Sequence, residues 1–372
     1  MLDRQASNDT AADSASTHDF DAQWYLDSYP LVSSEIGAGA ARDPEEHYRK
    51  IGRYRGYLPN YAERRPDNPA APPSKFGGMW TDHGNALDLL AGKHELGLEN
   101  DDQAALLSQW IRDGYVIIKN ALPPSILDPA RADLEAAYRG DLPNVIMECV
   151  EQQPRLSTFL PHHATLPTKA LDLHWLLPST RRAIFAPKIT DFLESVFERR
   201  PMASQTLGFW RGSQQGSHQD SAYVSYSLNM HFCASWIAYE DVQQGAGELL
   251  FYPGSQKLPE YLYVDGLKNI VDADRLHPQN VLSQQIAQHV NELPGRAAEA
   301  GLTEHTFLGK AGDVLIWSAD LAHGGKPISA NATRMSMVTH YCPKELTPLF
   351  FEQAKREIRF HDEVYPYATS VY

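Results

Sequence analysis

The stretch GSHQDSAYVSYSLNMHFCASWIAY (residues 216–239) joins a His-X-Asp pair to a run of β-forming residues. Successive side chains of an extended chain point to opposite faces, so His218 and Asp220 are expected on one face. Downstream, KAGDVLIWSADLAHGG (310–325) is typical of an apolar strand that ends in a Gly-flanked histidine, His323. Two histidines and one carboxylate form the facial triad that binds non-haem iron(II). The conjunction predicts a metal site made of these three residues.

Each of these elements alone has an ordinary interpretation. The chain contains 15 histidines, so an isolated His-X-Asp pair is close to a chance event. His323 taken by itself is equally typical of a hydrogen-bonded core or loop histidine. The prediction therefore rests on finding both motifs at strand ends with a β-rich stretch between them.

The order of the patterns along the chain indicates the fold class. Helical patterns precede residue 204, and short β runs separated by Gly, Pro and Asp follow it. This order predicts a mainly β fold with flanking helices, a barrel or jelly roll. Residues 267–300 interrupt the β runs as a helical insert. We expect this insert to form a lid or a substrate-recognition wall, because loops at a barrel mouth carry specificity.

The chain divides into four predicted parts. Residues 1–18 are rich in Ala, Ser, Asp and Thr and predict a disordered leader. Residues 19–60 predict a small aromatic module with two short helices, one of which begins at Asp43-Pro44. Residues 61–75 are Pro-rich and predict a linker. Residues 76–372 predict the main β domain.

Composition excludes several classes of function. The formal net charge of −14 argues against a nucleic-acid partner, because phosphate binding requires a basic face. The three cysteines are far apart and predict neither disulfides nor a zinc site, which favours a reducing cytoplasm. The N-terminus lacks the pattern of a signal peptide, and no apolar run is long enough for a membrane span.

A basic residue follows the second motif. Arg334 and Ser336 lie in RMSMVTHYC (334–342), where strand alternation places both on one face. A guanidinium beside a hydroxyl suits the distal carboxylate of a bound 2-oxo diacid, because arginine binds carboxylates with two parallel hydrogen bonds. The ordinary interpretation of Arg334 alone is a pair with a surface acid.

These segments resemble the phytanoyl-CoA dioxygenase (PhyH) family. The resemblance is carried by residues 218–255, by KAGDVLIWSADLAHGG, by the downstream arginine and by the entry sequence WIRDGYVII (110–118). It covers roughly residues 100–345 and is weak between Leu258 and His305, where the helical insert lies.

The resemblance implies a double-stranded β-helix (a cupin-like jelly roll) and an enzyme that uses Fe(II), 2-oxoglutarate and O2. By position, the family's iron ligands fall on His218, Asp220 and His323, and its 2-oxoglutarate arginine on Arg334. Trp236 matches an aromatic position near the cofactor pocket. Related halogenases have a small residue at the position of Asp220, so a carboxylate there favours hydroxylation of an unactivated C–H, with release of succinate and CO2.

The aromatic module suggests the substrate. Its sequence resembles a segment attached to bacterial glycosyltransferases, which implies a small-molecule or glycan-linked substrate and a glycosyltransferase-complex partner. We also expect its tyrosines and Trp24 to stack on sugar rings or to dock on such a partner. Two alternatives stay open: a metal-containing cupin-type enzyme that does not use 2-oxoglutarate, and a catalytically inactive scaffold in a glycan-synthesis complex.

Overall fold

The computed structural model describes residues 20–29, 31–52, 59–60, 74, 76–226, 228–270, 280–349 and 357–369. The predicted leader and nearly all of the predicted linker fall outside these ranges, and so does part of the helical insert.

The described strands form two sheets. The larger has ten strands, eight of them in the order β1-β9-β6-β11-β5-β4-β2-β3. In addition, β13 pairs with β5, and β12 pairs with β13. The smaller has the order β10-β7-β8. The strand bounds are β1 Tyr115–Ile118, β2 Ile146–Glu148, β3 Leu156–Ser157, β4 Lys169–Leu171, β5 Pro201–Phe209, β6 Cys233–Ala238, β7 Leu249–Phe251, β8 His305–Phe307, β9 Val314–Ser318, β10 His323–Gly325, β11 Ser336–Pro343, β12 Glu357–His361 and β13 Tyr365–Thr369.

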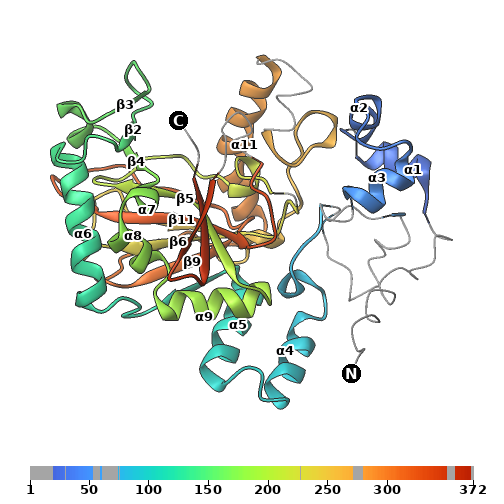
Figure 1. Ribbon diagram of the computed structural model, residues 1–372, viewed down its shortest axis with the longest axis horizontal. Coiled ribbons are helices and arrows are strands. Elements are labelled where there is room, and N and C mark those ends of the chain that lie inside the picture. Colours follow the sequence, from blue (N-terminus) through green and yellow to red (C-terminus); the bar gives the residue numbers. More distant parts are fainter. Residues whose placement is uncertain are drawn as a thin grey trace, which may run out of the picture.

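Helices cover one face of the large sheet, as Figure 1 shows for α6, α8 and α9. The helix that precedes the first strand ends at Gly114, whose φ of 75° lies in the left-handed region that favours glycine. Gly114 thus ends α5 directly before β1. The helix bounds are α1 Ala22–Ser28, α2 Leu31–Gly37, α3 Pro44–Lys50, α4 Ala86–Glu95, α5 Asp101–Asp113, α6 Pro124–Arg139, α7 Leu173–Leu176, α8 Pro178–Ile184, α9 Pro187–Phe197 and α11 Asn280–Glu299.

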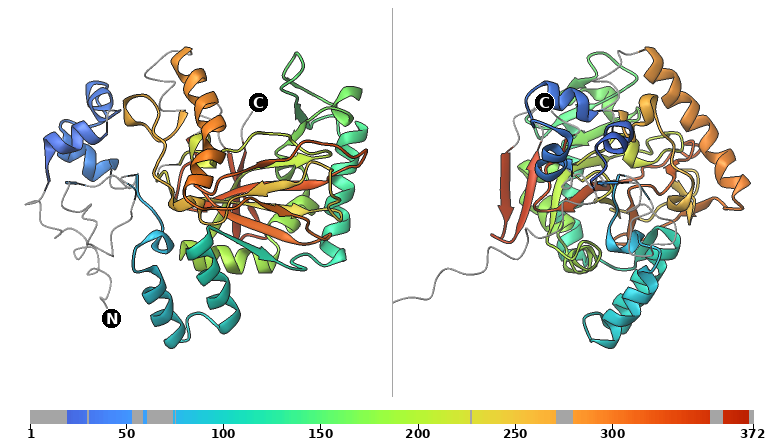
Figure 2. Two further views of the ribbon diagram at one scale, coloured as in Figure 1. Left: turned by 180° about the vertical axis from the view of Figure 1, so that it is seen from behind. Right: turned by 90° about the vertical axis from the view of Figure 1, so that its right-hand side faces the viewer.

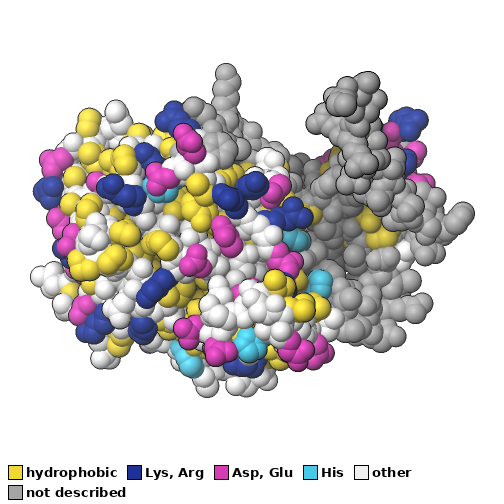
Figure 3. Space-filling model, turned by 60° about the horizontal axis from the view of Figure 1, so that its bottom comes forward, with side chains coloured by type: hydrophobic (Ala, Val, Ile, Leu, Met, Phe, Trp, Pro, Cys, Tyr) yellow, Lys and Arg dark blue, Asp and Glu magenta, His cyan; other side chains and the backbone are white. Residues whose placement is uncertain are grey.

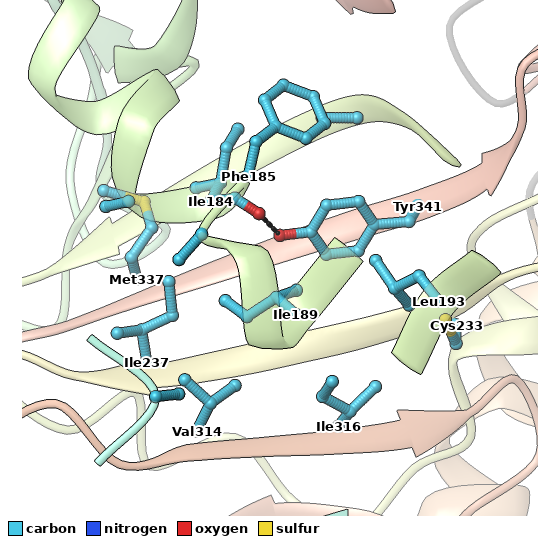
Figure 4. Close-up of a cluster of buried hydrophobic side chains, with 14 of the residues drawn as sticks. Ile184, Phe185, Ile189, Leu193, Cys233, Ile237, Val314, Ile316, Met337 and Tyr341 are labelled. Carbon is cyan, nitrogen blue, oxygen red and sulfur yellow. Dashed lines mark hydrogen bonds between the residues drawn. The ribbon is translucent and has the colours of Figure 1, made fainter. Parts of the chain in front are cut away.

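Alternation along the central strands separates two cores. In β9, Val314 and Ile316 pack with the helices, whereas Leu315 and Trp317 point toward the small sheet. The same alternation runs through β6 and β11, and Figure 4 shows the helix-facing side chains meeting α8 and α9. Tyr341 of β11 donates its hydroxyl to the Ile184 carbonyl oxygen at 2.7 Å within this cluster. The large sheet therefore has a closed apolar face and a second face turned to the small sheet.

The structure confirms the fold class: a mainly β, cupin-like double-stranded β-helix with flanking helices (Figure 2). Two strand predictions are wrong in detail. Residues 228–232 form no strand, since β6 begins only at Cys233. β11 begins at Ser336, so Arg334 precedes the strand rather than lying in it. All three cysteines are buried and free, as expected of small core residues.

The described part of the aromatic module forms three short helices, α1, α2 and α3, rather than the two predicted (Figure 1). The predicted helix start is confirmed, because Asp43 caps α3 and Pro44 occupies its first turn. Tyr25, Tyr29 and Val32 are buried in the module's own core. Tyr25 and Tyr29 are therefore not available to stack on a sugar, which contradicts the expectation for these two residues.

Within the described residues, no helix has the length and apolar character needed to cross a membrane. Figure 3 shows Lys and Arg side chains interspersed with Asp and Glu over one face of the molecule. The described part of that face presents no continuous basic patch of the kind that phosphate backbones require.

Candidate metal centre and catalytic cavity

The three predicted ligands meet where the two sheets come together. His218 and His323 form an antiparallel bridge, in which each backbone N–H donates to the other residue's carbonyl oxygen, at 2.8 and 2.9 Å. Asp220 lies two residues further on, at the start of the short helical turn Asp220–Ala222 rather than in a strand. A side chain on Gly324 would come within 2.9 Å of the Gln215 carbonyl oxygen, so glycine lets the two segments approach closely.

The ligating atoms converge on a single point. Asp220 Oδ1 lies 3.7 Å from His218 Nε2 and 3.6 Å from His323 Nε2. The three buried groups offer ligand atoms that all lie within 4.8 Å of one another. Among the described residues this is the one such group of His, Cys, Asp and Glu side chains. At this spacing the three ligand atoms can bind the same metal ion and leave its remaining coordination positions open.

Both imidazoles are oriented by backbone carbonyls. Nδ1 of His218 lies 2.9 Å from the Gly216 carbonyl oxygen, and Nδ1 of His323 lies 2.9 Å from that of Leu321. A carbonyl accepts only, so each Nδ1 carries the proton and each Nε2 presents its lone pair to the shared point. This tautomer is the one that a metal requires.

The carboxylate is oriented by two further side chains. Asp220 Oδ2 accepts a hydrogen bond from Trp317 Nε1 at 2.9 Å, and His340 Nε2 lies 3.5 Å from the same oxygen. These contacts turn Oδ1 toward the two histidines. The sequence analysis did not assign this role to Trp317 or His340. Strand alternation in the sequence already places Trp317 on the same face as Leu315, and His340 on the same face as Ser336. This alternation is the signal that could have indicated their side of the sheet.

The charge states suit a cation. Burial, with a smaller contribution from the nearby His323, lowers the pKa of His218 to about 3, so its imidazole is neutral near pH 7. Burial alone would raise the pKa of the Asp220 carboxyl, but its interactions with His323, His340 and His218 outweigh burial and hold that pKa below its usual range. Two imidazoles and one ionised carboxylate form the donor set expected for Fe(II).

A cavity of about 580 Å³ opens from this point between the sheets. Its inner wall carries Arg334, which is 2% exposed and donates from Nη1 to the Gly247 carbonyl oxygen at 2.7 Å. Arg334 Nε has no partner among the described residues. The guanidinium lies 5.3 Å from the Trp236 ring. Burial lowers its pKa to about 10, so it stays charged near pH 7 and leaves donors for an anion.

The predicted residues around Arg334 differ in their placement. Trp236 lines the cavity, and its Nε1 is buried without a hydrogen-bond partner among the described residues. Ser336 is fully buried and has the same strand parity as the cavity-lining Val338 and His340. Its own side chain does not appear among the described residues that line the cavity. The structure thus brings Trp236, but not Ser336, to the cavity surface.

The outer end of the cavity carries charges that the sequence analysis did not single out. Glu148 of β2 accepts from Arg155 Nε at 2.9 Å, and its second oxygen lies 3.3 Å from Lys169 Nζ. The Arg155 side chain is 59% exposed and that of Lys169 is 25% exposed, so this end faces solvent. Glu151 lines the same wall. The mouth of the cavity therefore carries two cations, Arg155 and Lys169, and two carboxylates, Glu148 and Glu151, whose charges cancel.

The helical insert lies behind the metal site. Leu293 and Ala297 of α11 pack with Ala322, next to His323. Lys268 donates to Asp320 Oδ2 at 2.8 Å. No residue of the insert's described part lines the catalytic cavity, so the predicted recognition wall is wrong for that part.

Asp320 links the two ligand-bearing segments. Its backbone carbonyl oxygen accepts from Gln219 Nε2 at 2.6 Å, and its Oδ1 accepts from the Ser221 hydroxyl. Gln219 and Ser221 flank Asp220, and Asp320 lies three residues before His323. With its carboxylate also bound to Lys268, Asp320 ties the insert to both ligand segments.

Comparison with known families identifies the chain. A family model described as phytanoyl-CoA dioxygenase (PhyH) matches residues 110–336, which is more than half of the sequence. The chain belongs to the PhyH family. As a PhyH protein it is a 2-oxoglutarate-dependent oxygenase that uses Fe(II), 2-oxoglutarate and O2, as predicted. The matched range includes all six predicted site residues.

Three solved structures are similar to this chain in fold. The non-heme alpha ketoglutarate dependent epimerase SnoN from nogalamycin biosynthesis is 16% identical, with a TM-score of 0.47 over 66% of this chain and 84% of that one. EctD from S. alaskensis is 14% identical, with a TM-score of 0.47 over 66% and 77%. The non-heme monooxygenase ThoJ is 17% identical, with a TM-score of 0.41 over 65% and 78%. No curated protein sequence matches this chain.

Proposed function

We propose that His218, Asp220 and His323 hold the iron and that Arg334 holds the distal carboxylate of 2-oxoglutarate. The observation that carries this proposal is the pair of complementary features in one cavity: three convergent ligands and a buried, incompletely paired guanidinium. When bound, iron and 2-oxoglutarate activate O2, so that one oxygen atom enters succinate and the other enters the substrate, with release of CO2.

The chain's own residues set the geometry of this reaction. The Gly216 and Leu321 carbonyl oxygens fix the imidazoles, and Trp317 and His340 fix the carboxylate. Arg334 is 2% exposed, so a co-substrate carboxylate bound there is shielded from water. Since Asp220 fills the position of the third ligand, the site favours hydroxylation of a C–H bond over halogenation.

We further propose a polar small-molecule or glycan-linked substrate. Gln205, Gln215 and Tyr223 line the cavity and offer hydrogen bonds to hydroxyl groups. The balanced charges at the mouth do not favour a polyphosphate such as a CoA ester. A glycosyltransferase-complex partner and a cytoplasmic location stay predictions. The division of the chain into leader, module (19–60), linker, oxygenase domain (76–372) and insert also stays a prediction.

Succinate release tests this function. The iron-loaded protein is given 2-oxoglutarate and O2 with a panel of glycan precursors and acyl-CoAs. A saccharide is expected to stimulate succinate formation, whereas an acyl-CoA is not. Asp220→Ala should abolish the reaction. Asp241→Ala, which removes an exposed carboxylate bound to Lys310, serves as the matched control and should retain it.

Strong stimulation by an acyl-CoA alone would overturn the substrate proposal and leave the iron site intact. Succinate formation at an unchanged rate in Asp220→Ala would overturn the metal site itself. A metal-dependent product that forms without 2-oxoglutarate would favour the cupin-type alternative.

A further inference from the structure

A second cavity, of about 750 Å³, lies behind the strand that leads to His323. Ser318, Ala319 and Asp320 line it, whereas Trp317 and His323 line the catalytic cavity. The two cavities therefore lie on opposite sides of one short segment. None of the three predicted metal ligands lines the second cavity, which makes it a separate site.

This cavity contains a carboxylate without a cationic partner. Asp82 Oδ2 accepts a hydrogen bond from the Met79 backbone N–H at 2.8 Å. No lysine, arginine or histidine forms an ion pair with Asp82 in the described part of the chain. Burial, with a smaller contribution from the charge of Asp320, raises the pKa of Asp82 to about 7 against the lowering effect of the Met79 N–H. Unpaired carboxylates below the surface are uncommon, since they keep the cost of desolvation without a compensating charge.

The other polar groups in the cavity leave the same deficit of positive charge. Asp320 and Glu260 share one cation, Lys268, whose Nζ lies 2.8 Å and 3.6 Å from their carboxylate oxygens. Burial lowers the pKa of His83, so this lining residue adds no charge near pH 7. Gln256 Oε1 is buried without a donor among the described residues. Lys257 also lines the cavity, at an exposed position and without an ion pair among the described residues. The carboxylates of Asp82, Glu260 and Asp320 therefore outnumber the two lysines, Lys257 and Lys268, by one, and the lining offers acceptors and this one uncompensated negative charge to a ligand.

The rest of the lining selects the kind of cation. Met79, Ile111, Met230 and Leu262 give the cavity apolar walls, which suit an organic body. The carboxylates do not gather as metal ligands, because among the described residues only the His218 group brings its ligand atoms within 4.8 Å of one another. An organic ammonium group fits these observations, and a bare metal ion does not.

We propose that this second cavity binds a small organic cation, a primary ammonium group on an apolar body, with Asp82 as its counter-ion. A primary ammonium carries three donors, so it can also use a second acceptor such as Gln256 Oε1. The bound molecule contacts the segment that leads into His323 and leaves the catalytic cavity open.

Calorimetric titration of the anaerobic protein, loaded with Fe(II) and 2-oxoglutarate, tests the proposal. The probes are hexylamine, hexanol and hexanoate, at mildly alkaline pH where Asp82 is ionised. Hexylamine is expected to bind, whereas hexanol and hexanoate are not. Asp82→Asn, which keeps the shape and an acceptor for the Met79 N–H, should weaken hexylamine binding by at least about tenfold. Asp88→Asn, at an exposed position of α4, is the matched control and should bind as the wild-type chain does.

A second variant keeps the charge and removes the space. Leu262→Trp fills the rim of the cavity, where Leu262 is 37% exposed, and should also weaken hexylamine binding. Absence of hexylamine binding to the wild-type chain would overturn the proposal. So would equal binding to Asp82→Asn, or hexanol binding as tightly as hexylamine. The iron and 2-oxoglutarate spectrum reports the integrity of each variant, so a misfolded protein is recognised before titration.

Discussion

The two faces of the large sheet have different roles, although the same strands form both. Toward the helices, Val314, Ile316 and Tyr341 form a closed apolar layer with one buried hydroxyl bonded to a backbone carbonyl. Toward the small sheet, Trp317 and His340 leave the same strands to orient a carboxylate at a cavity. Because side chains alternate along a strand, one residue packs into the apolar core and the next faces the catalytic cavity.

The comparison teaches how a substitution on either face should behave. The helix-facing layer is satisfied within itself, so a change there should act on the free energy of unfolding. The cavity face holds three convergent ligands and a guanidinium with unused donors, so a change there should act on iron or 2-oxoglutarate binding. The four predictions below test this separation, from the largest expected effect to the smallest.

Removal of a metal ligand should have the largest effect. Asp220→Ala and His218→Ala should each nearly abolish Fe(II) binding and 2-oxoglutarate decarboxylation, since loss of one of three ligands removes charge balance and geometry. Metal content and succinate formation measure the loss. Full turnover by Asp220→Ala without added carboxylate or halide would show that the ligand set is different.

Ile316→Ala probes the closed face at its centre. Ile316 is fully buried against the helices, so the cavity left behind should lower the free energy of unfolding by about 2–5 kcal/mol. Urea unfolding measures the change. Below its unfolding transition, the variant should keep the wild-type requirement for 2-oxoglutarate. A raised requirement in the folded variant would show that the two faces are coupled.

Arg334→Ala should act on the co-substrate alone. It should retain iron and raise the 2-oxoglutarate requirement at least tenfold, or about 1.4 kcal/mol, because a buried charge-assisted pair is lost. Arg334→Lys should recover only part of this, since an ammonium lacks the planar fork of a guanidinium. The 2-oxoglutarate dependence of succinate formation decides the case. An unchanged dependence in Arg334→Ala would mean that another residue holds the co-substrate.

Tyr341→Phe should have the smallest effect. It removes the hydroxyl that donates to the Ile184 carbonyl oxygen at 2.7 Å and keeps the ring in place. The expected cost is about 1 kcal/mol in the free energy of unfolding, which the shift of the urea midpoint measures. The requirements for iron and 2-oxoglutarate should stay at wild-type values. A change in either would contradict the separation of the two faces.

The parts of the molecule that local patterns dictate were predictable from the sequence. The end of α5 at Gly114, the cap of α3 at Asp43 and the triad itself follow from short motifs with defined geometry. The prediction that His218 and Asp220 face one point is confirmed, although Asp220 lies in a helical turn rather than a strand. From this turn Asp220 Oδ1 lies 3.7 Å from His218 Nε2 and 3.6 Å from His323 Nε2.

Long-range contacts account for what the sequence did not predict. Whether Trp317 reaches Asp220 depends on the pairing of residues 218–221 with residues 319–323, and no local pattern specifies that register. The position of the insert depends on Lys268 meeting Asp320, 52 residues away. In the module, Tyr25 and Tyr29 belong to a residue type that also forms sugar-binding surfaces. Only the packing of the module shows that these two residues belong to its core.

The central claim is that one cavity binds Fe(II) through the triad and 2-oxoglutarate through the metal and Arg334. Anaerobic titration of the iron-loaded chain with 2-oxoglutarate tests it most directly. The account predicts a weak visible charge-transfer band that grows to saturation at one 2-oxoglutarate per chain. In Arg334→Ala the same band should need a higher concentration of 2-oxoglutarate. Bound iron that gives no such band at any concentration of 2-oxoglutarate would contradict the claim.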